Sequence, residues 1–347
     1  MDAEFEILCE TRGQAGVITL NRPRALNALT LGMVREMRRA LDAWRTDPAV
    51  TRIVVRGAGE KAFCAGGDIR RLTELGLAGQ PQEALAFWRE EYQLNALIKN
   101  YPKPYISLID GIVMGGGVGI SLHGRYRVAG ERYLFAMPEV GIGFFPDVGA
   151  TFALPRLPGC TGLYIALTGE RIKRADAMAL GLATHAVNGA DFDFLLDQLA
   201  AGDSVEQTLA ARAVDPGAAP LSRERALIDR CFSAASVSAI LDCLERDGSE
   251  PACRMHEAIR TKSPTSLNLA FEQMRRGGDL TFADAMRTEF RIVSRVFEGR
   301  DFFEGVRAVL IDKDGKPQWQ PATLSAIDNA EIAGYFADLG PAELEIE

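Results

Sequence analysis

Histidine is scarce in this sequence, and the cysteines are scattered. Only three histidines occur among 347 residues, at positions 123, 185 and 256, and none forms an H-x-x-x-H pattern or lies beside acids at metal-ligand spacing. The six cysteines include no C-x-x-C pair, and a chain of this size has no need of disulfide bonds in order to fold. We therefore expect no metal site, and a reduced protein in a reducing compartment.

A long apolar run and an excess of basic residues are also missing. No stretch approaches the ~18–20 apolar residues that a membrane-spanning helix needs, and residues 1–10 carry acids rather than a basic segment followed by an apolar run. The net charge of −8 disfavours nucleic-acid binding, although a few local Arg or Lys side chains can still hold a phosphorylated ligand. We expect a soluble, cytoplasmic protein whose partners include neither a membrane nor a nucleic acid.

The residues that are present can bury one large core and a smaller appendage, because 47% are hydrophobic and 25% are charged. Short apolar runs alternate with helical periodicity in the N-terminal half. We expect strands at 16–20, 52–56 and 105–109, and helices at 31–44 and 81–100.

Strand signals fade past about residue 190, so the second half is expected to be mainly helical. Helices are predicted over 222–246 and 264–297. Within the second of these, Thr281 and Asp284 have the spacing of a capping box that opens an amphipathic run.

A domain boundary is expected within residues 200–220, which are rich in Ala, Gly, Asp and Pro and show little apolar periodicity. It would separate a strand-bearing core, residues 1–200, from a helical region, residues 201–347.

Two glycine-bearing segments could carry chemistry. Ala62–Asp68 follows a predicted strand and places Gly66 and Gly67 where a turn exposes backbone N–H groups. Met114–Gly119 contains three successive glycines between a strand and a helix, so an N–H at the helix start could face an anion. The alternative for each segment taken alone is an ordinary strand-to-helix turn.

A third segment, Phe135–Asp147, carries two carboxylates. Glu139 and Asp147 lie eight residues apart among apolar, Gly and Pro residues. Such surroundings tend to raise a carboxyl pKa, as an acid, base or nucleophile requires. The alternative for either acid taken singly is a solvated loop position.

Two further motifs suggest other enzymes. Gly57–Ala62 matches the dinucleotide-binding pattern G-x-G-x-x-A, but the glycines at 66–67 interrupt any helix starting there. Gly119–His123 nearly matches a nucleophile elbow, yet its histidine is too close to Ser121 for a catalytic triad. We expect Ser121 to be a helix-packing residue and His123 a satisfied neighbour.

Taken together, the three segments resemble the crotonase (enoyl-CoA hydratase/isomerase) superfamily. The shared order runs from Asn21–Leu29 through Ala65–Asp68 and the glycine run to Pro138–Gly143. The resemblance spans nearly the whole chain and narrows to the 3-hydroxyisobutyryl-CoA hydrolase branch. The motifs of that branch are Phe63–Arg70, Arg89–Tyr92, Phe145–Gly149, Ser263–Leu267 and Glu304–Asp314.

The resemblance implies an α/β, crotonase-like (β-β-α)n spiral followed by helices that close the site. It also implies catalytic roles. The N–H groups of Gly67 and Gly116 would form an oxyanion hole for the thioester carbonyl. Glu139 would attack the thioester or activate water, and Asp147 would assist proton transfer or hold the substrate. The choice between the two routes stays open.

Substrate-binding positions follow from the same resemblance. Glu91 would accept a hydrogen bond from a 3-hydroxyl group, its alternative being a charge on a solvated helix face. Arg24, in the loop 21–27, would meet a phosphate of coenzyme A, its alternative being a plain surface arginine. The remaining expected positions are Ala25, Ala65, Gly66, Asp68 and Gly115.

The function implied is hydrolysis of a small 3-hydroxyacyl-CoA thioester, foremost 3-hydroxyisobutyryl-CoA in valine breakdown, with 3-hydroxypropionyl-CoA left open. The runner-up is an enoyl-CoA hydratase or isomerase, but the first catalytic glutamate of a hydratase would fall where this chain has Gly119. A non-catalytic scaffold would have no use for the two carboxylates. No metal or redox cofactor is implied, coenzyme A enters as part of the substrate, and a homo-oligomer is left open.

Overall fold

The computed structural model describes residues 5–346 and divides into two compact units whose segments alternate along the chain. The strand unit comprises residues up to 68, 93–135 and 171–220. The helical unit comprises residues 69–92, 136–170 and those from 221 onward. This division differs from the expected one at residue 200, because residues 69–92 and 136–170 group with the C-terminal helices. Residues 1–4 and 347 of the expected regions lie outside the described residues.

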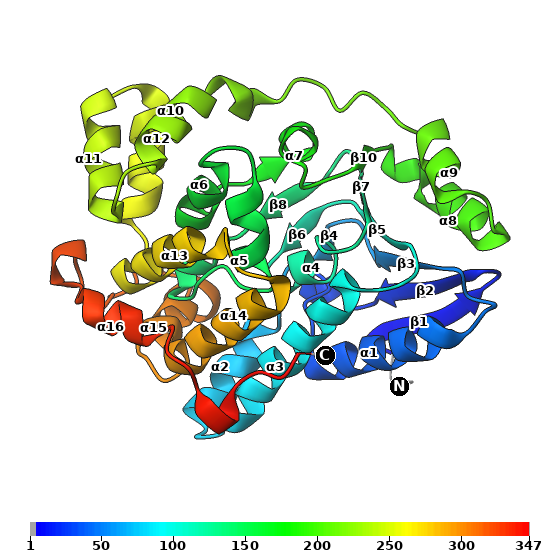
Figure 1. Ribbon diagram of the computed structural model, residues 1–347, viewed down its shortest axis with the longest axis horizontal. Helices are drawn as coiled ribbons and strands as arrows, with labels where there is room; N and C mark the ends of the chain where they lie inside the picture. The colour runs from blue at the N-terminus through cyan, green and yellow to red at the C-terminus, as the bar shows by residue number, and fades with distance from the viewer. Residues whose placement is uncertain (1–4, 347) are drawn as a thin grey trace. The chain divides into compact units, whose positions relative to one another are not determined.

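One sheet of the strand unit has six strands in the order β1-β2-β3-β5-β7-β10 (Figure 1). β1 and β2 form an antiparallel pair, and each later neighbour is parallel. The bounds are β1 (Ile7–Arg12), β2 (Ala15–Leu20), β3 (Arg52–Gly57), β5 (Tyr105–Ile109), β7 (Tyr126–Ala129) and β10 (His185–Ala186). The predicted strands at 16–20, 52–56 and 105–109 are therefore confirmed.

A second, four-stranded sheet has the order β4-β6-β8-β9. Its strands are β4 (Ala62–Cys64), β6 (Ile112–Met114), β8 (Leu134–Ala136) and β9 (Ile172–Lys173). Consecutive strands along the chain, such as β3 and β4 or β5 and β6, enter the two sheets alternately before a helix follows. This is the expected β-β-α spiral.

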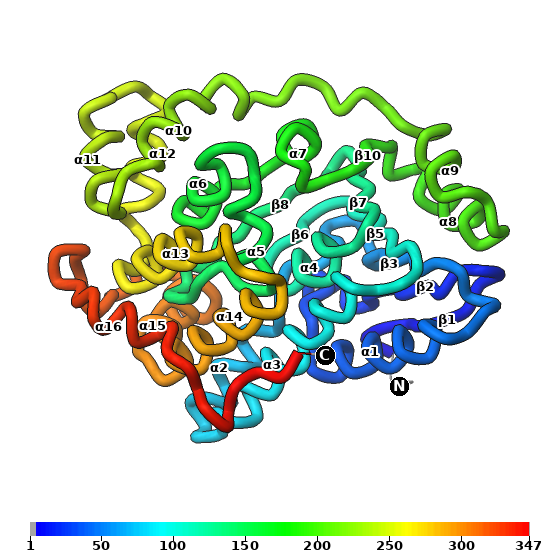
Figure 2. Tube along the Cα trace, viewed as in Figure 1, coloured from blue at the N-terminus to red at the C-terminus, as the bar shows by residue number. Residues whose placement is uncertain are grey.

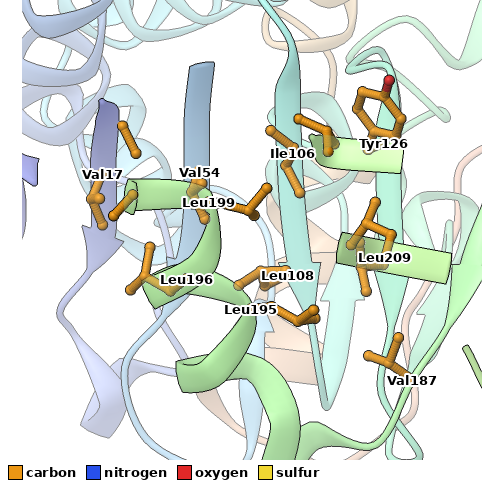
Figure 3. Packing of buried hydrophobic residues seen from close by; sticks show 14 residues of the cluster. Val17, Val54, Ile106, Leu108, Tyr126, Val187, Leu195, Leu196, Leu199 and Leu209 are labelled. Atoms are coloured by element: carbon orange, nitrogen blue, oxygen red, sulfur yellow. The ribbon is translucent and has the colours of Figure 1, made fainter. Parts of the chain in front are cut away.

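Helices cover one face of the larger sheet and seal its core. In Figure 3, leucines of α8 (Phe192–Ala201) lie over Val17, Val54 and Ile106, which the register places side by side on β2, β3 and β5, and Leu209 of α9 (Val205–Ala211) lies over β7. These side chains belong to one buried apolar cluster. Full burial of each such side chain contributes about 1.5–3 kcal/mol.

The helix α9 corrects one sequence-based prediction. It lies inside the segment 200–220, which was expected to be a boundary with little periodicity, and its Val205 and Leu209 are buried in the strand-unit core. After α9 the chain runs as an extended segment before the next helix, as Figure 2 shows. The strand unit therefore ends at Pro220, at the far end of the expected boundary.

The remaining helices of the strand unit are α1, α4 and α7, and α3 passes from the helical unit into it at residue 93. Thr30 caps α1 by accepting a hydrogen bond from the Met33 N–H at 3.2 Å. The bounds are α1 (Leu31–Thr46), α3 (Pro81–Lys99), α4 (Gly116–Gly119) and α7 (Arg174–Leu180). The helices predicted at 31–44 and 81–100 are confirmed.

The helical unit contains most of the C-terminal helices, among which α10, α11 and α12 lie side by side (Figure 2). Each of the two long segments predicted as helical, 222–246 and 264–297, contains two helices rather than one. Ser236 caps the second helix of the first segment, α11, and Thr281 caps the second helix of the other, α14. The bounds are α2 (Ile69–Leu77), α5 (Ala150–Ala153), α6 (Thr161–Thr168), α10 (Arg225–Phe232), α11 (Val237–Asp247), α12 (Glu250–Arg260), α13 (Pro264–Gly277), α14 (Phe282–Val296), α15 (Asp301–Val306) and α16 (Asn329–Gly334). Among residues 5–346, no helix has the length and apolarity to cross a membrane.

Candidate active site

Two glycine turns lie beside each other in the strand unit, where the parallel strands β4 and β6 end. A Cβ atom added to Gly66 would lie 3.9 Å from the backbone N of Gly116. Gly66 and Gly115 have φ angles of 123° and 46°, which glycine adopts without the steric cost that other residues meet. The structure thus brings together the glycines that the sequence singled out.

The N–H groups of Gly67 and Gly116 are the expected oxyanion donors. Gly116 is the first residue of α4, and the first N–H groups of a helix have no acceptor within it. Gly67 forms an isolated parallel bridge with Leu29, but the bonds of that bridge use the N–H groups of Leu29 and Asp68. Their role as oxyanion donors stays a prediction, and the backbone geometry is compatible with it.

The start of α4 packs tightly on the end of β4. A Cβ atom added to Gly117 would lie 2.3 Å from the carbonyl oxygen of Cys64, far inside van der Waals contact. Only glycine at 117 lets α4 approach the strand this closely, so it helps to set the position of the neighbouring Gly116.

The expected coenzyme A loop is tied to the first glycine turn. The Ala65 N–H donates to the Leu26 carbonyl at 3.0 Å, and the Arg22 guanidinium pairs with the Asp68 carboxylate at 3.0 Å. Asp68 is expected to bind substrate, but its carboxylate already has a cationic partner within the protein. This ion pair restricts the orientations of the Asp68 side chain that could contact a ligand.

Arg24 and Ala25 lie in a short 3-10 helix, η1 (Pro23–Ala25), and both are exposed. The Asn27 side chain anchors this loop by donating to the carbonyls of Ala58 and Ala62, each at 2.9 Å. The exposed Arg24 guanidinium can reach a phosphate, but contact with coenzyme A stays a prediction.

In the helical unit, Glu139 and Asp147 are buried, with 6% and 5% of their surfaces exposed. Glu139 begins the 3-10 helix η2 (Glu139–Ile142), and its carbonyl accepts the Phe144 N–H at 3.0 Å. Burial raises the pKa of the Glu139 carboxyl well above its ordinary value, and the charge of Asp147 raises it further. These acids are not the solvated loop residues of the alternative interpretation.

Glu91 and Tyr92 on α3 approach the same pair. The Tyr92 hydroxyl donates to Oδ2 of Asp147 at 2.8 Å. Burial raises the pKa of Asp147 to about 7, although the Tyr92 hydrogen bond lowers it. Glu91 is 2% exposed, so it does not lie on a solvated helix face, and burial followed by the charge of Asp147 raises its pKa.

Sequence reasoning missed Tyr92 and Glu289. Glu289 on α14 is fully buried and accepts the N–H groups of Gly149 at 2.8 Å and Thr151 at 2.9 Å. Burial, and next the charge of Asp147, raises the pKa of Glu289 to about 8. A signal existed for each: Tyr92 directly follows Glu91, and Glu289 is an acid on the apolar face of an amphipathic helix.

The competing motifs do not form the sites they suggest. The run Gly57–Ala62 leads into β4 rather than into a helix, so it lacks the helix N-terminus of a dinucleotide site. Ser121 is buried and donates to the Gly117 carbonyl at 2.7 Å, as a packing residue does. Within the described part of the chain, no group of three or more His, Cys, Asp or Glu side chains could hold a metal ion.

The sequence matches the family model described as enoyl-CoA hydratase/isomerase over residues 15–336. Curated relatives include proteins named 3-hydroxyisobutyryl-CoA hydrolase, mitochondrial. The one from Danio rerio is 46% identical and covers 99% of this chain and 92% of its own length. The one from Homo sapiens is 44% identical, with coverage of 99% and 92%. Their names place these relatives in mitochondria and so do not support a cytoplasmic location.

Solved structures with the same fold carry other titles. A carnitinyl-CoA dehydratase from Mycobacterium thermoresistibile has a TM-score of 0.95 at 42% identity, covering 99% of both chains. An enoyl-CoA hydratase from Rhodobacter sphaeroides 2.4.1 has a TM-score of 0.92 at 40% identity, covering 99% of this chain and 100% of its own.

Proposed function

The chain belongs to the enoyl-CoA hydratase/isomerase family, and from this premise we propose that it hydrolyses 3-hydroxyisobutyryl-CoA to the free acid and coenzyme A. The observation that carries the proposal is the buried carboxyl pair Glu139 and Asp147. Carboxyls with raised pKa values can serve as the nucleophile or base and as the proton carrier that thioester hydrolysis needs. The curated relatives named 3-hydroxyisobutyryl-CoA hydrolase support the same activity.

In this proposal the backbone N–H groups of Gly67 and Gly116 bind the developing thioester oxyanion. Each such donor contributes about 2.7–4 kcal/mol in known enzymes. Either a Glu139 oxygen attacks the carbonyl carbon to give an anhydride that water then cleaves, or Glu139 takes a proton from the attacking water. The C–S bond breaks, and Asp147 supplies a proton to the departing thiolate.

In this proposal, Glu91 makes the enzyme prefer an acyl group that carries a 3-hydroxyl. Its buried Oε1 has no hydrogen-bond partner within residues 5–346. A substrate 3-hydroxyl could donate to that oxygen, whereas an acyl group without the hydroxyl would leave a buried acceptor unpaired. Sites of this kind reject the analogue that lacks the hydroxyl by about 10⁴-fold or more.

Hydration of an enoyl-CoA is the second candidate, because the two solved structures described above carry hydratase and dehydratase titles. Adding water across a double bond in this family uses two glutamates. The position expected for the first is Gly119, a buried residue at the end of α4 with no side chain to move a proton. We therefore favour hydrolysis.

Thiol release separates the two candidates. Purified protein would be given 3-hydroxyisobutyryl-CoA, isobutyryl-CoA and crotonyl-CoA in parallel, and free coenzyme A titrated with a thiol reagent. We expect fast release from the hydroxylated thioester alone. If no thiol appears and crotonyl-CoA instead gains water, the protein is a hydratase.

Three finer properties remain proposals. Valine breakdown is the proposed pathway. The names of the relatives state the substrate, 3-hydroxyisobutyryl-CoA, but they do not state a pathway. A reducing compartment is proposed because all six cysteines are free thiols. A homo-oligomer is compatible with the family, and sedimentation analysis of the purified chain would give the number of subunits.

A further inference from the structure

A single turn of the helical unit carries Asp147, and three side chains from three helices hold it. Tyr92 of α3 donates to the Asp147 carboxylate at 2.8 Å. Gln273 of α13 donates through Nε2 to the Pro146 carbonyl at 2.5 Å. Glu289 of α14 accepts two of the backbone N–H groups that follow Asp147, those of Gly149 and Thr151.

The turn needs such support because its backbone is unusual. Val148, directly after Asp147, has a φ angle of 54°, and Gly149 has one of 89°. A positive φ is costly for a β-branched residue and persists only where the surroundings enforce it. Each carboxylate oxygen of Glu289 accepts one N–H of the turn, and these two hydrogen bonds hold the backbone in this conformation.

Glu289 also lies within a cluster of buried titratable groups. The titratable groups that face it are Glu91 and Tyr92 of α3, Glu139 of η2 and Asp147 of the turn. The contact from α13, Gln273, is neutral. Each of the four carboxyls has its pKa raised, with burial as the largest cause.

Cations on the same elements have other partners. Arg89 of α3 donates to the carbonyls of Ala342 and Glu343. Arg291 of α14 pairs with Asp338 and Glu343. Lys262 lies beside η2, where a Cβ on Gly141 would be 3.5 Å from its Nζ, and its charge interacts with Glu170. None of these charges is among the causes of the carboxyl shifts.

We propose that Glu289 is a positioning residue for the hydrolysis proposed above: through two backbone N–H groups it fixes the Asp147 turn, and with it the hydrogen bond from Tyr92 to Asp147. It does not need to touch the substrate. The inference rests on the proposed function for its kinetic consequence, while the effect of Glu289 on the other carboxyls can be measured without turnover.

Two variants test this contact. Glu289→Gln keeps the length of the side chain but removes one of its two acceptors. Glu289→Asp keeps the carboxyl group but shortens the side chain, so it cannot reach both N–H groups. Glu298→Gln is the matched control, because Glu298 is an exposed acid just beyond α14.

Both Glu289 variants should lower kcat by about 10- to 100-fold with KM changed less than about twofold, as expected for a misplaced catalytic group. Both should also move the limb of the pH profile that reports Asp147 to higher pH, because a displaced turn weakens the Tyr92 hydrogen bond that lowers the Asp147 pKa. The control should match the parent protein in both. A purely structural role would change melting temperature in both Glu289 variants without moving the pH profile.

Infrared titration of the protonated carboxyl band makes the test independent of turnover. The Asp147 contribution is assigned as the band lost in Asp147→Asn. In both Glu289 variants, the Asp147 band should disappear at higher pH than in the parent, because the Tyr92 hydrogen bond that lowers its pKa is weakened. An unchanged titration overturns the inference even if the parent is an active hydrolase. A shifted titration in a parent that releases no coenzyme A leaves the positioning of Asp147 standing and removes the hydrolase proposal instead.

Discussion

At the scale of single residues, the main feature of the protein is a set of four buried carboxyl groups in the helical unit. Glu91, Glu139, Asp147 and Glu289 are each no more than 6% exposed. Two buried carboxyl oxygens of this group, Oε1 of Glu91 and Oε2 of Glu139, have no hydrogen-bond partner within residues 5–346. Burying polar atoms unpaired is costly unless a ligand completes them. Such cost is expected at a site that binds or transforms something.

Replacing Glu139 by glutamine should test the central acid. The change keeps size and burial but removes the nucleophile or base, so kcat should fall by at least ~100-fold with binding largely retained. Steady-state thiol release gives kcat and KM. The exposed Glu298→Gln serves again as the control, and near-normal turnover by Glu139→Gln would remove Glu139 from the mechanism.

Replacing Tyr92 by phenylalanine should test its hydrogen bond to Asp147. The bond lowers the pKa of Asp147 against the larger effect of burial, so its loss should raise that pKa. Whichever limb of the pH–rate profile reports Asp147 should move to higher pH, and kcat should fall by about tenfold. Tyr101→Phe is the control, because the Tyr101 hydroxyl donates to a backbone carbonyl, that of Leu41. Superimposable profiles would show that Tyr92 does not influence Asp147.

Strands and long helices are largely predictable from the sequence, whereas short helices and breaks are less so. β5 occupies the predicted residues 105–109, because a run of apolar residues of this length fits a strand buried on both faces. α9 was missed because seven residues hold too few turns to show a period. The break before α11 depends on Ser236, whose hydroxyl accepts the Ala239 N–H at 3.2 Å.

Replacing Gly117 by alanine should disturb the packing of α4 on β4. The added Cβ would meet the Cys64 carbonyl oxygen at 2.3 Å, and backbone cannot give way cheaply. We expect about 1–3 kcal/mol of lost stability and about 100-fold lower kcat from displacement of the Gly116 N–H.

Gly32→Ala on α1 is the matched control for that change. Its Cβ would meet only the Thr30 hydroxyl, at 3.6 Å, and alanine favours helix over glycine by about 1 kcal/mol. The test compares the activity and the unfolding free energy of the parent protein, Gly117→Ala and Gly32→Ala. Full activity in Gly117→Ala would show that α4 tolerates displacement.

The chain as a whole should lose stability as pH rises through the neutral range. Burial raises the pKa of Asp147 to about 7 and that of Glu289 to about 8, both above their ordinary values. Between about pH 4 and 8 the folded protein thus binds more protons than the unfolded chain, and each such proton lowers the unfolding free energy by up to about 1.4 kcal/mol per pH unit. His185 opposes this below its ordinary pKa, since burial lowers its value.

Asp147→Asn isolates that contribution. The variant should lose activity, show a shallower fall of unfolding free energy between pH 5 and 8, and melt higher than the parent at pH 8. Denaturant titrations at each pH supply the comparison. Parallel stability curves for the two proteins would mean that Asp147 carries its charge in the folded state without cost.

For the site, the sequence predicts the burial of single acids better than it predicts their partners. The burial of Glu139 and Asp147 agrees with the expectation drawn from their apolar segment, and the burial of Glu91 excludes a solvated helix face, while its contact with substrate stays a prediction. Glu289 escaped notice because its partners, the N–H groups of Gly149 and Thr151, lie about 140 residues away in the chain. Almost every residue type has a backbone N–H group, so the amino-acid sequence does not indicate which of them a distant side chain will bind. Only the folded structure reveals such a contact.

The alternation of the two units along the chain has a consequence for synthesis on the ribosome. The last segment of the strand unit ends at residue 220, so the nascent chain can complete its sheets and glycine turns early. The Asp147 turn must wait for Gln273 and Glu289, which emerge much later. A growing or truncated chain can therefore offer a finished sheet scaffold while its acids are still unplaced, and thioester cleavage is among the last properties that the protein acquires.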